Sequence, residues 1–461
     1  MIKIKDFIGT KSFYKMTLSI AVPMMVQNLI SNFVNLLDNV MVGSLGTEEM
    51  SGVSIVNQLF FVFTLALFGA VSGAGIFTSQ FHGKNDHDGI RYTIRFKTVT
   101  VILLTIIALL VFIFFGDFLI SLYLHDADDS ANLELTAQIA RKYLNIILIG
   151  LFPFAISNIF SSTLRETGQT VIPMVTGFVA VFTNCALNYV LIFGKFGAPA
   201  LGAEGAAIAT VISRYVECAV FITYIFIKRK SYPFFKGAFK SLYIPKSLFK
   251  SITARGLPLL FNEFLWAAGM SALSMSYSLH GIAVVAGYSI SSTVVNLLSI
   301  SFQSLGASIS IIVGKLLGAS KFDEAIATVK KMFAFTLFAS VLVGASIFVM
   351  SNPILMLYNT SEESKNYAEF FMKTVAIITP INAFAHASYF TLRSGGKTFI
   401  TFLFDSVFLL GFVVPFAFAL YYLGHLSIFI IFPIVQATDI IKDIIGFIFI
   451  KKKVWVNNIV D

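Results

Sequence analysis

The stretch VTVILLTIIALLVFIFFG, residues 99–116, contains no charged side chain. An α-helix rises 1.5 Å per residue, so about 20 apolar residues cross the roughly 30 Å hydrocarbon core of a bilayer. Comparable stretches recur along the 461 residues, of which 57% are hydrophobic and only 12% are charged. Because a lipid-embedded helix satisfies its own backbone hydrogen bonds, the sequence predicts an all-α integral membrane protein.

Polar clusters divide the chain into twelve predicted membrane spans. They lie near residues 17–42, 53–81, 98–123, 138–163, 170–194, 203–227, 256–279, 283–314, 332–357, 368–392, 399–422 and 427–450. No small-residue cleavage site follows the first apolar stretch, so we expect it to be retained as a signal anchor. Cys185 and Cys218 lie within apolar segments and match neither a disulfide framework nor a metal motif.

Basic and acidic residues occupy alternate connections between the predicted spans. The basic connections carry Lys3, Lys5, Lys11, Lys15, Lys84, Arg91, Arg95, Lys97, Arg165, the run from 228 to 255, Lys315, Lys321, Lys330, Lys331, Arg393, Lys397 and Lys451 to Lys453, and the others carry Glu48, Glu49, Asp126, Asp128, Asp129, Glu204, Glu362 and Glu363. The positive-inside rule then predicts a cell-membrane protein with both termini in the cytoplasm. This bias explains the net charge of +9, so we expect no nucleic-acid partner.

The two halves of the sequence repeat. Pro23 near the start of the first span matches Pro258 in the seventh, and Arg165 at the end of the fourth matches Arg393 in the tenth. An even number of spans per repeat gives both halves the same orientation, a parallel pseudo-two-fold repeat of two six-helix lobes. The predicted domains are residues 1–228 (N-terminal lobe), 229–255 (cytoplasmic connection) and 256–461 (C-terminal lobe), and residues 242–254 could form an interfacial amphipathic helix.

A carboxylate, Asp38, lies about one helical turn inside the outer end of the first span. Asn184 and Asn188 share one face of the fifth span, and Thr210 in the sixth lies at similar depth. Their hard oxygen atoms could coordinate a small cation such as Na⁺, or the carboxylate could carry a proton. The alternative is that Asn184, Asn188 and Thr210 only join helices, while Asp38 reaches the outer membrane interface or pairs with Arg214.

A second acid, Glu263, lies about two turns into the seventh span, next to Asn262 and before Trp266. It could hold a proton or a cationic substrate, or it could be a hydrated carboxylate near a helix start. Other ionisable residues at membrane depth are predicted to be structural pairs, namely Arg214 with Glu217 and Asp439, Lys442 and Asp443 among themselves, while Asp405 and His386 are weaker candidates. Some of the 50 Phe residues could bind flat organic cations by cation–π contact.

Several stretches together resemble the multidrug and toxic compound extrusion (MATE) transporters over nearly the whole chain. They are LDNVMVGSLG (37–46), GAGIF (73–77), QFHG (80–83), LRETG (164–168), NCALNY (184–189), GAEGAAIAT (202–210) and residues 258–266. The resemblance implies two six-helix lobes forming a V and drug extrusion driven by inward flow of Na⁺ or H⁺. It also implies no enzyme activity and no cofactor besides the coupling ion.

The resemblance also implies roles for individual residues. The acid matched by Asp38 is the family's central coupling residue, surrounded by the positions matched by Asn184, Asn188 and Thr210. Some members have Asp at the position of Asn188, so the choice between Na⁺ and H⁺ stays open. The acid matched by Glu263 is a second-lobe cation site in another branch, whose further Asp in span ten is matched here only by Asn382.

The predicted function is secondary active multidrug efflux, an antiport of amphipathic and often cationic organic compounds against Na⁺ or H⁺ by alternating access. The expected partners are these small compounds, the coupling ion and the lipid bilayer, and we expect a monomer. A lipid-linked oligosaccharide flippase of the same superfamily would more typically have further spans and a strongly cationic cavity. A passive channel would show a ring of like pore residues, and an intramembrane enzyme would show a catalytic motif. The sequence shows neither of these signals.

Overall fold

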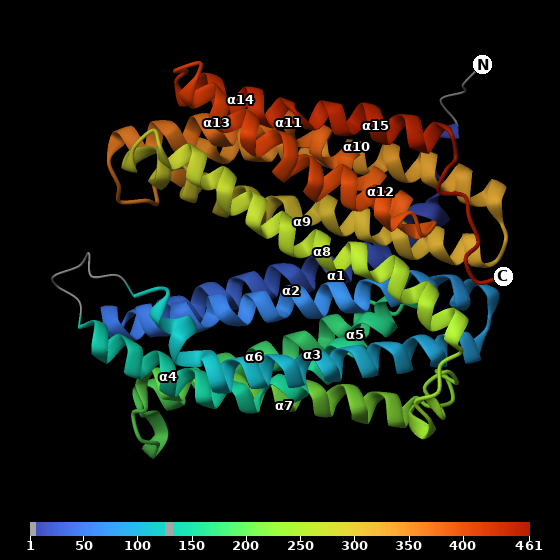
Figure 1. The fold of residues 1–461 in the computed structure, drawn as a ribbon, viewed down its shortest axis with the longest axis horizontal. Helices are drawn as coiled ribbons and strands as arrows, with labels where there is room; N and C mark the ends of the chain where they lie inside the picture. Colours follow the sequence, from blue (N-terminus) through green and yellow to red (C-terminus); the bar gives the residue numbers. More distant parts are fainter. Residues whose placement is uncertain (1–5, 125–131) are drawn as a thin grey trace. The chain divides into compact units, whose positions relative to one another are not determined.

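The structure, a computed structural model, describes residues 6–124 and 132–461, apart from the side chains of residues 35 and 36. Helices and the turns between them account for the described chain, and no β-strand occurs in it (Figure 1). The prediction of an all-α protein is therefore confirmed. Lys3, Lys5, Asp126, Asp128 and Asp129, which contributed to the predicted orientation in the membrane, lie outside the described residues.

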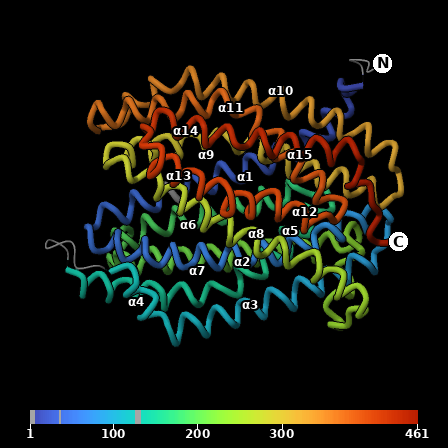
Figure 2. The backbone as a smooth tube through the Cα atoms, turned by 45° about the horizontal axis from the view of Figure 1, so that its top comes forward, coloured from blue at the N-terminus to red at the C-terminus, as the bar shows by residue number. Residues whose placement is uncertain are grey.

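The helices follow the predicted apolar stretches, with longer ends. They are α1 (Lys11–Gly43), α2 (Thr47–Lys84), α3 (His87–Ser121), α4 (Leu133–Ile149), α5 (Leu151–Glu166), α6 (Val171–Phe193), α7 (Gly202–Ile227), α8 (Lys246–Ser278), α9 (Ile282–Gly318), α10 (Phe322–Leu355), α11 (Glu362–Ser394), α12 (Thr398–Phe402), α13 (Val414–Tyr422), α14 (Ile428–Ala437) and α15 (Asp439–Lys451). Short 3₁₀ turns η2 (Lys195–Gly197) and η3 (Ala238–Lys240) occur in loops. The π-helical turns η4 (Leu403–Val407) and η5 (Leu409–Val413) join α12 to α13 in one continuous rod (Figure 2).

Within the described residues, nine helices are long and apolar enough to cross a membrane. A tenth span results if α4 and α5, which meet at a bend of 49° beside Gly150, are counted together. The sequence predicts this stretch as one span without a bend. The structure therefore shows a multi-pass membrane protein, and the count of twelve spans stays a prediction.

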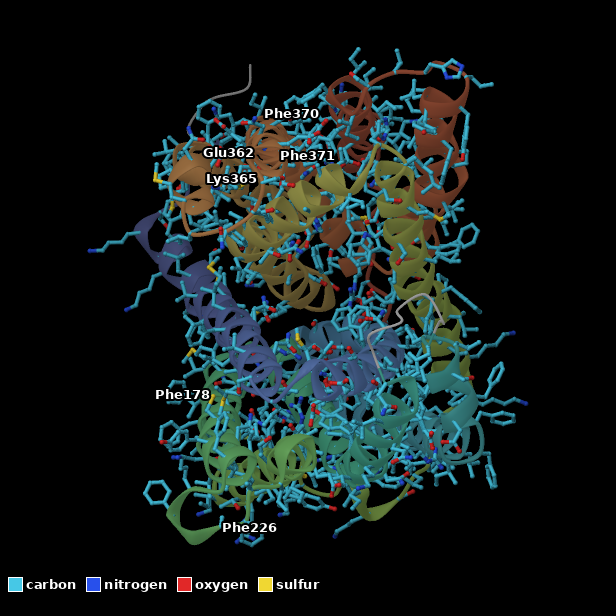
Figure 3. All side chains as sticks on the ribbon, turned by 90° about the vertical axis from the view of Figure 1, so that its left-hand side faces the viewer. Phe178, Phe226, Glu362, Lys365, Phe370 and Phe371 are labelled. Atoms are coloured by element: carbon cyan, nitrogen blue, oxygen red, sulfur yellow. The ribbon has the colours of Figure 1, made fainter. Side chains whose placement is uncertain are left out.

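Large apolar side chains cover much of the helix surface. Phe114 and Phe118 on α3 are 74% and 60% exposed, and Phe226, labelled in Figure 3, is 69% exposed. A water-soluble protein rarely exposes contiguous apolar surface on this scale. These helix faces are suited to contact with lipid.

The chain divides into two compact units. The α3–α7 unit contains residues 26–75 and 87–250, and the α9–α15 unit contains the chain up to Met25, residues 76–86 and residues 251–461. Boundaries between the units fall inside α1, α2 and α8, which contribute to both. The predicted boundaries of the lobes at 228 and 256 follow chain order and stay a prediction.

Each unit has its own buried core. In the α3–α7 unit, Leu67, Leu144 and Phe221 are no more than 2% exposed. In the α9–α15 unit, one cluster gathers Ile309, Met332 and other side chains of α9, α10 and α11 around the buried Trp455. Figure 1 shows α9, α10 and α11 side by side in this unit.

The internal repeat is visible in the helices themselves. Helices α1 and α8 have the same length, 33 residues. Pro23 in α1 and Pro258 in α8 occupy the same position, counted from the first residue of each helix. Arg165 and Arg393 each lie in the last turn of their helices. The two halves thus repeat in structure as well as in sequence.

The connection before α8 differs from the prediction. No separate amphipathic helix covers residues 242–254, because α8 begins at Lys246 and continues to Ser278. The preceding loop is held against α3 by arginine side chains: Arg91 donates to the carbonyl of Pro233 (3.0 Å), and Arg95 donates to those of Ala238 (2.9 Å) and Tyr243 (2.9 Å). This loop packs on its own unit through specific hydrogen bonds.

Candidate functional site: the Asp38 cluster

The four residues predicted at one depth form a hydrogen-bonded cluster in the α3–α7 unit. Asp38 comes from α1, Asn184 and Asn188 from α6, and Thr210 from α7. The Asn188 amide nitrogen donates to Asp38 Oδ1 at 2.5 Å and to Asn184 Oδ1 at 3.3 Å. Helical spacing puts the two asparagines on one face of α6, and that face is turned toward α1 and α7.

The Asn184 amide can serve Asp38 and Thr210 together. With its nitrogen toward α1, it donates to Asp38 Oδ1 at 3.0 Å and to Oδ2 at 3.2 Å, while its oxygen accepts from the Thr210 hydroxyl at 3.2 Å. In the opposite orientation the same nitrogen donates to Thr210 Oγ1 at 3.2 Å. Asn184 and Asn188 are 5% and 1% exposed, so both amides act out of water, where hydrogen bonds to a carboxylate are strongest.

One oxygen in the cluster has spare capacity. Asn188 Oδ1 is buried and has no hydrogen-bond partner in the described structure. A buried unsatisfied acceptor is costly and calls for an explanation such as an unplaced ion or water. Together with the Asp38 carboxylate and the oxygens of Asn184 and Thr210, it gives a set of hard donors that fits a small monovalent cation. No group of three His, Cys, Asp or Glu suited to a metal ion occurs within the described residues.

Tyr143 on α4 is a member of the cluster that sequence analysis missed. It is 4% exposed and lies near Thr210 and Asp38. A lone tyrosine in an apolar span carries no sequence signal of such a role. Tyr143 adds a residue of a fourth helix to the surroundings of the cluster.

Arg214 is neutralised inside the same unit rather than by Asp38. Its guanidinium lies 3.3 Å from Glu217 Oε2 and 4.5 Å from the centre of the Phe154 ring. The predicted pair of Arg214 and Glu217 is therefore present. The alternative in which Arg214 forms an ion pair with Asp38 is not.

An apolar groove of about 370 Å³ runs beside the cluster between α1 and α6. Its lining includes Leu37, which precedes Asp38, and Cys185, which follows Asn184. Phe33, Phe178 and Phe182 also line it. The volume is within the range of small-molecule pockets.

The residues predicted as a second-lobe site do not form a hydrogen-bonded cluster like that around Asp38. Within the described part of the chain, no hydrogen bond connects Asn262, Glu263, Trp266 and Asn382 with one another. Asn262 bonds instead to Asp405, at 3.0 Å, and the charged groups near Glu263 are Arg393 and Asp405. Trp266 is 40% exposed, and Asn382 Oδ1 is buried without a partner. A second-lobe cation site at these four residues stays a prediction.

The helices and the Asp38 cluster define a membrane protein with a candidate ion site, and comparison with known proteins gives its family. The family model described as MatE matches residues 23–190 and 258–419, two copies that begin at the repeated prolines Pro23 and Pro258. The probable multidrug resistance protein NorM of Thermotoga maritima is 28% identical over 389 residues, which cover 83% of this chain and 80% of the relative. NorM of Bacillus subtilis is 26% identical over 391 residues, covering 82% and 83%.

A solved structure shares the fold. The crystal structure of MATE in the straight conformation matches with a TM-score of 0.83 and 18% identity, covering 98% of both chains. The chain belongs to the MatE family, as the resemblance in its sequence had predicted. Because members of this family are transporters, the expectation that the chain is not an enzyme is also confirmed.

Proposed function

We propose that this protein is a secondary active multidrug efflux transporter, which exports amphipathic and often cationic organic compounds in antiport with Na⁺ or H⁺. The observation that carries the proposal is the Asp38 carboxylate, held by two buried amides beside an unpartnered amide oxygen. The relatives described as multidrug resistance proteins support the substrate class. The transporter acts in the cell membrane as a monomer, with both termini in the cytoplasm.

The coupling step takes place at Asp38. A cation that binds this carboxylate removes an uncompensated charge from the helix packing of the α3–α7 unit. It shifts the equilibrium between two conformations only by the difference in its affinity for them. Na⁺ would use the amide and hydroxyl oxygens of Asn188, Asn184 and Thr210, whereas a proton would need only Asp38 and one acceptor.

The apolar groove beside the cluster supports an amphipathic substrate. Its aromatic side chains, Phe33, Phe178 and Phe182, offer ring faces for a flat apolar body. Leu37 and Cys185 of the groove are chain neighbours of Asp38 and Asn184, so we expect binding of ion and substrate to influence each other. Mutual exclusion at one such site is sufficient for antiport.

The rival functions have less support. A flippase for lipid-linked sugars would need a strongly cationic cavity, and the guanidinium of Arg214 is already paired with Glu217. A passive channel would not need a carboxylate held by buried amides. Neither rival explains the cluster.

Dye efflux from reconstituted vesicles, with Na⁺ and pH gradients imposed separately, tests the proposal. We expect one gradient to drive wild-type transport and Asp38→Asn to reduce that transport about a hundredfold, because the amide cannot bind a cation as the carboxylate does. Glu324→Gln is the matched control: Glu324 forms an exposed pair with Lys321 at 3.3 Å, and such pairs contribute little.

Two further measurements complete this test. Thermal unfolding and size-exclusion chromatography should show that Asp38→Asn is folded. Wild-type transport with neither gradient, or full transport by folded Asp38→Asn, contradicts ion coupling at this residue. The gradient that drives transport identifies the ion.

A further inference from the structure

A second charged cluster lies within the α9–α15 unit. It combines Asp405 from η4 with Asp439 and Lys442 from α15. Lys442 Nζ lies 3.0 Å from Asp439 Oδ1, 4.0 Å from Asp405 Oδ1 and 5.6 Å from the centre of the Phe408 ring. The Lys442 ammonium thus lies among two carboxylates and an aromatic ring.

Neutral groups fix the orientation of the Asp405 carboxylate. Asn262 Nδ2 donates to Asp405 Oδ2 at 3.0 Å, and the Ser406 hydroxyl lies 2.7 Å from both the backbone and the side-chain oxygen of Asn262. Asn262 is 3% and Ser406 0% exposed. Asp405 therefore keeps its geometry when its charged partner changes. It also lies in a π-helical turn, a feature that occurs often at functional sites.

The two ion-pair distances show which carboxylate is held less tightly. Asp439, one turn before Lys442 on the same helix, lies 3.0 Å from its ammonium, whereas Asp405 lies 4.0 Å from it. We therefore expect Lys442 to stay paired with Asp439 when Asp405 binds another cation. Further ionisable groups lie close by: Glu263 is near Asp405 and Arg393, and Asp443 is near Lys442. Asp405 is 25% exposed and is not sealed from ligands.

An aromatic ladder extends from this position along the same rod. The ring centres of Phe408 and Phe412 are 5.2 Å apart, and those of Phe412 and Phe416 are 5.5 Å apart with planes inclined by 13°. Phe412 is 41% exposed. Ring faces next to a carboxylate are the combination that binds an organic cation through charge and cation–π contact.

We propose that Asp405 is a binding residue for aromatic organic cations, and that Lys442 occupies it as a tethered ammonium in the absence of ligand. The cation of the ligand replaces Lys442 at Asp405, its rings lie against Phe412 and Phe416, and Lys442 remains on Asp439. The substrate class rests on the proposed efflux function. The site itself is separate from the Asp38 cluster in the chain and in its residues.

Equilibrium binding of tetraphenylphosphonium to the purified full chain in detergent tests this site without an ion gradient. Lys442→Gln should bind the probe more tightly, by about tenfold, because a competing ammonium is removed from Asp405. Asp405→Asn should bind it about tenfold more weakly, since a charge-assisted contact is lost. Phe412→Leu should weaken binding about threefold.

Lys373→Gln is the matched control. Lys373 also pairs with a carboxylate one turn away, Glu369 at 2.5 Å, and lies 5.5 Å from the centre of the Phe348 ring. It contacts none of the residues of the proposed site, so probe affinity should not change. A purely structural role for Lys442 predicts unchanged or weaker binding by Lys442→Gln, and either result overturns the proposal, as does unchanged binding by Asp405→Asn.

The double variant Asp405→Asn with Lys442→Gln keeps the test decisive if a single variant does not fold. It removes the ammonium together with one of its two carboxylates, so the net charge of Asp405, Asp439 and Lys442 taken together does not change. The double variant should bind the probe as weakly as Asp405→Asn, and wild-type affinity would overturn the proposal. Binding is measured without a gradient, so failure here leaves ion coupling at Asp38 intact, and failure of the gradient experiment leaves this site intact.

Discussion

The Asp38 and Asp405 clusters each hold a carboxylate among membrane helices, and they differ in the groups that surround it. In each, a carboxylate accepts a hydrogen bond from a buried asparagine, Asn188 at 2.5 Å or Asn262 at 3.0 Å. Only the second cluster contains an ammonium, because no lysine or arginine in the described residues forms an ion pair with Asp38. Arg214 lies near Asp38 without forming an ion pair with it, whereas Asp405 has the ammonium of Lys442 at 4.0 Å.

The internal repeat does not extend to these charges. The offset that relates Pro23 to Pro258 maps Asp38 onto Leu273. Leu273 is 5% exposed and belongs to an apolar core with Phe371 and Phe432. The two halves share helices and prolines, and their ionisable residues have diverged. This difference leads to predictions that leave both carboxylates in place.

Asn188→Leu should have the largest effect of these changes. It removes the amide donor to Asp38 and the unpartnered oxygen, and a hydrogen bond to a charged group contributes about 1.5–3 kcal/mol. We expect the concentration of coupling ion that gives half-maximal efflux to change by about ten- to hundredfold. Asn158→Leu is the control, since the Asn158 amide bonds only to the carbonyl of Phe154 in the preceding turn. An unchanged ion dependence would contradict a role for Asn188.

Asn262→Leu is expected to act less strongly, because Asp405 still has Lys442 nearby. The lost hydrogen bond should weaken binding of tetraphenylphosphonium about three- to tenfold, for a cost of about 1 kcal/mol. Gradient-driven affinity for the coupling ion should stay at the wild-type value. If this variant altered the ion dependence as strongly as Asn188→Leu, the two clusters could not be treated as separate.

Thr210→Val should have the smallest effect. It removes one neutral hydrogen bond, at 3.2 Å, that helps to hold Asn184 beside Asp38. Such a bond contributes about 1 kcal/mol, so the half-maximal ion concentration should change about three- to fivefold. Thr210→Ser keeps the hydroxyl and should restore the wild-type value. Failure of the serine to rescue would show that the methyl group, not the hydroxyl, is required.

Depth along predicted spans was sufficient to find the Asp38 cluster. Helical spacing and the regular rise of an α-helix placed Asp38, Asn184, Asn188 and Thr210 together, and their hydrogen bonds agree. The same reasoning could have paired Asp405 with Lys442. Asp405 and Lys442 lie at similar depths in the predicted spans 399–422 and 427–450, when both depths are counted from the cytoplasmic ends.

Other features had no sequence signal. The π-helical turns η4 and η5 depend on backbone hydrogen bonding that an apolar run does not specify. The 49° bend between α4 and α5 follows a single Gly150 in a continuous apolar stretch, where glycine alone seldom indicates a break. Local propensity therefore predicted that these helices exist and missed the irregular turns. Tertiary packing decides those turns.

Helix α2 carries a mechanical consequence. Its last turns pack so tightly against α9 that a Cβ atom on Gly83 would lie 1.9 Å from the carbonyl oxygen of Lys315, and Gln80 bonds to the backbone of Ser394 and Ile459. The first part of the same unbroken helix belongs to the α3–α7 unit. The unit boundary at Gly75 therefore falls in the middle of a continuous helix, so α2 is a covalent helical link that the two units share.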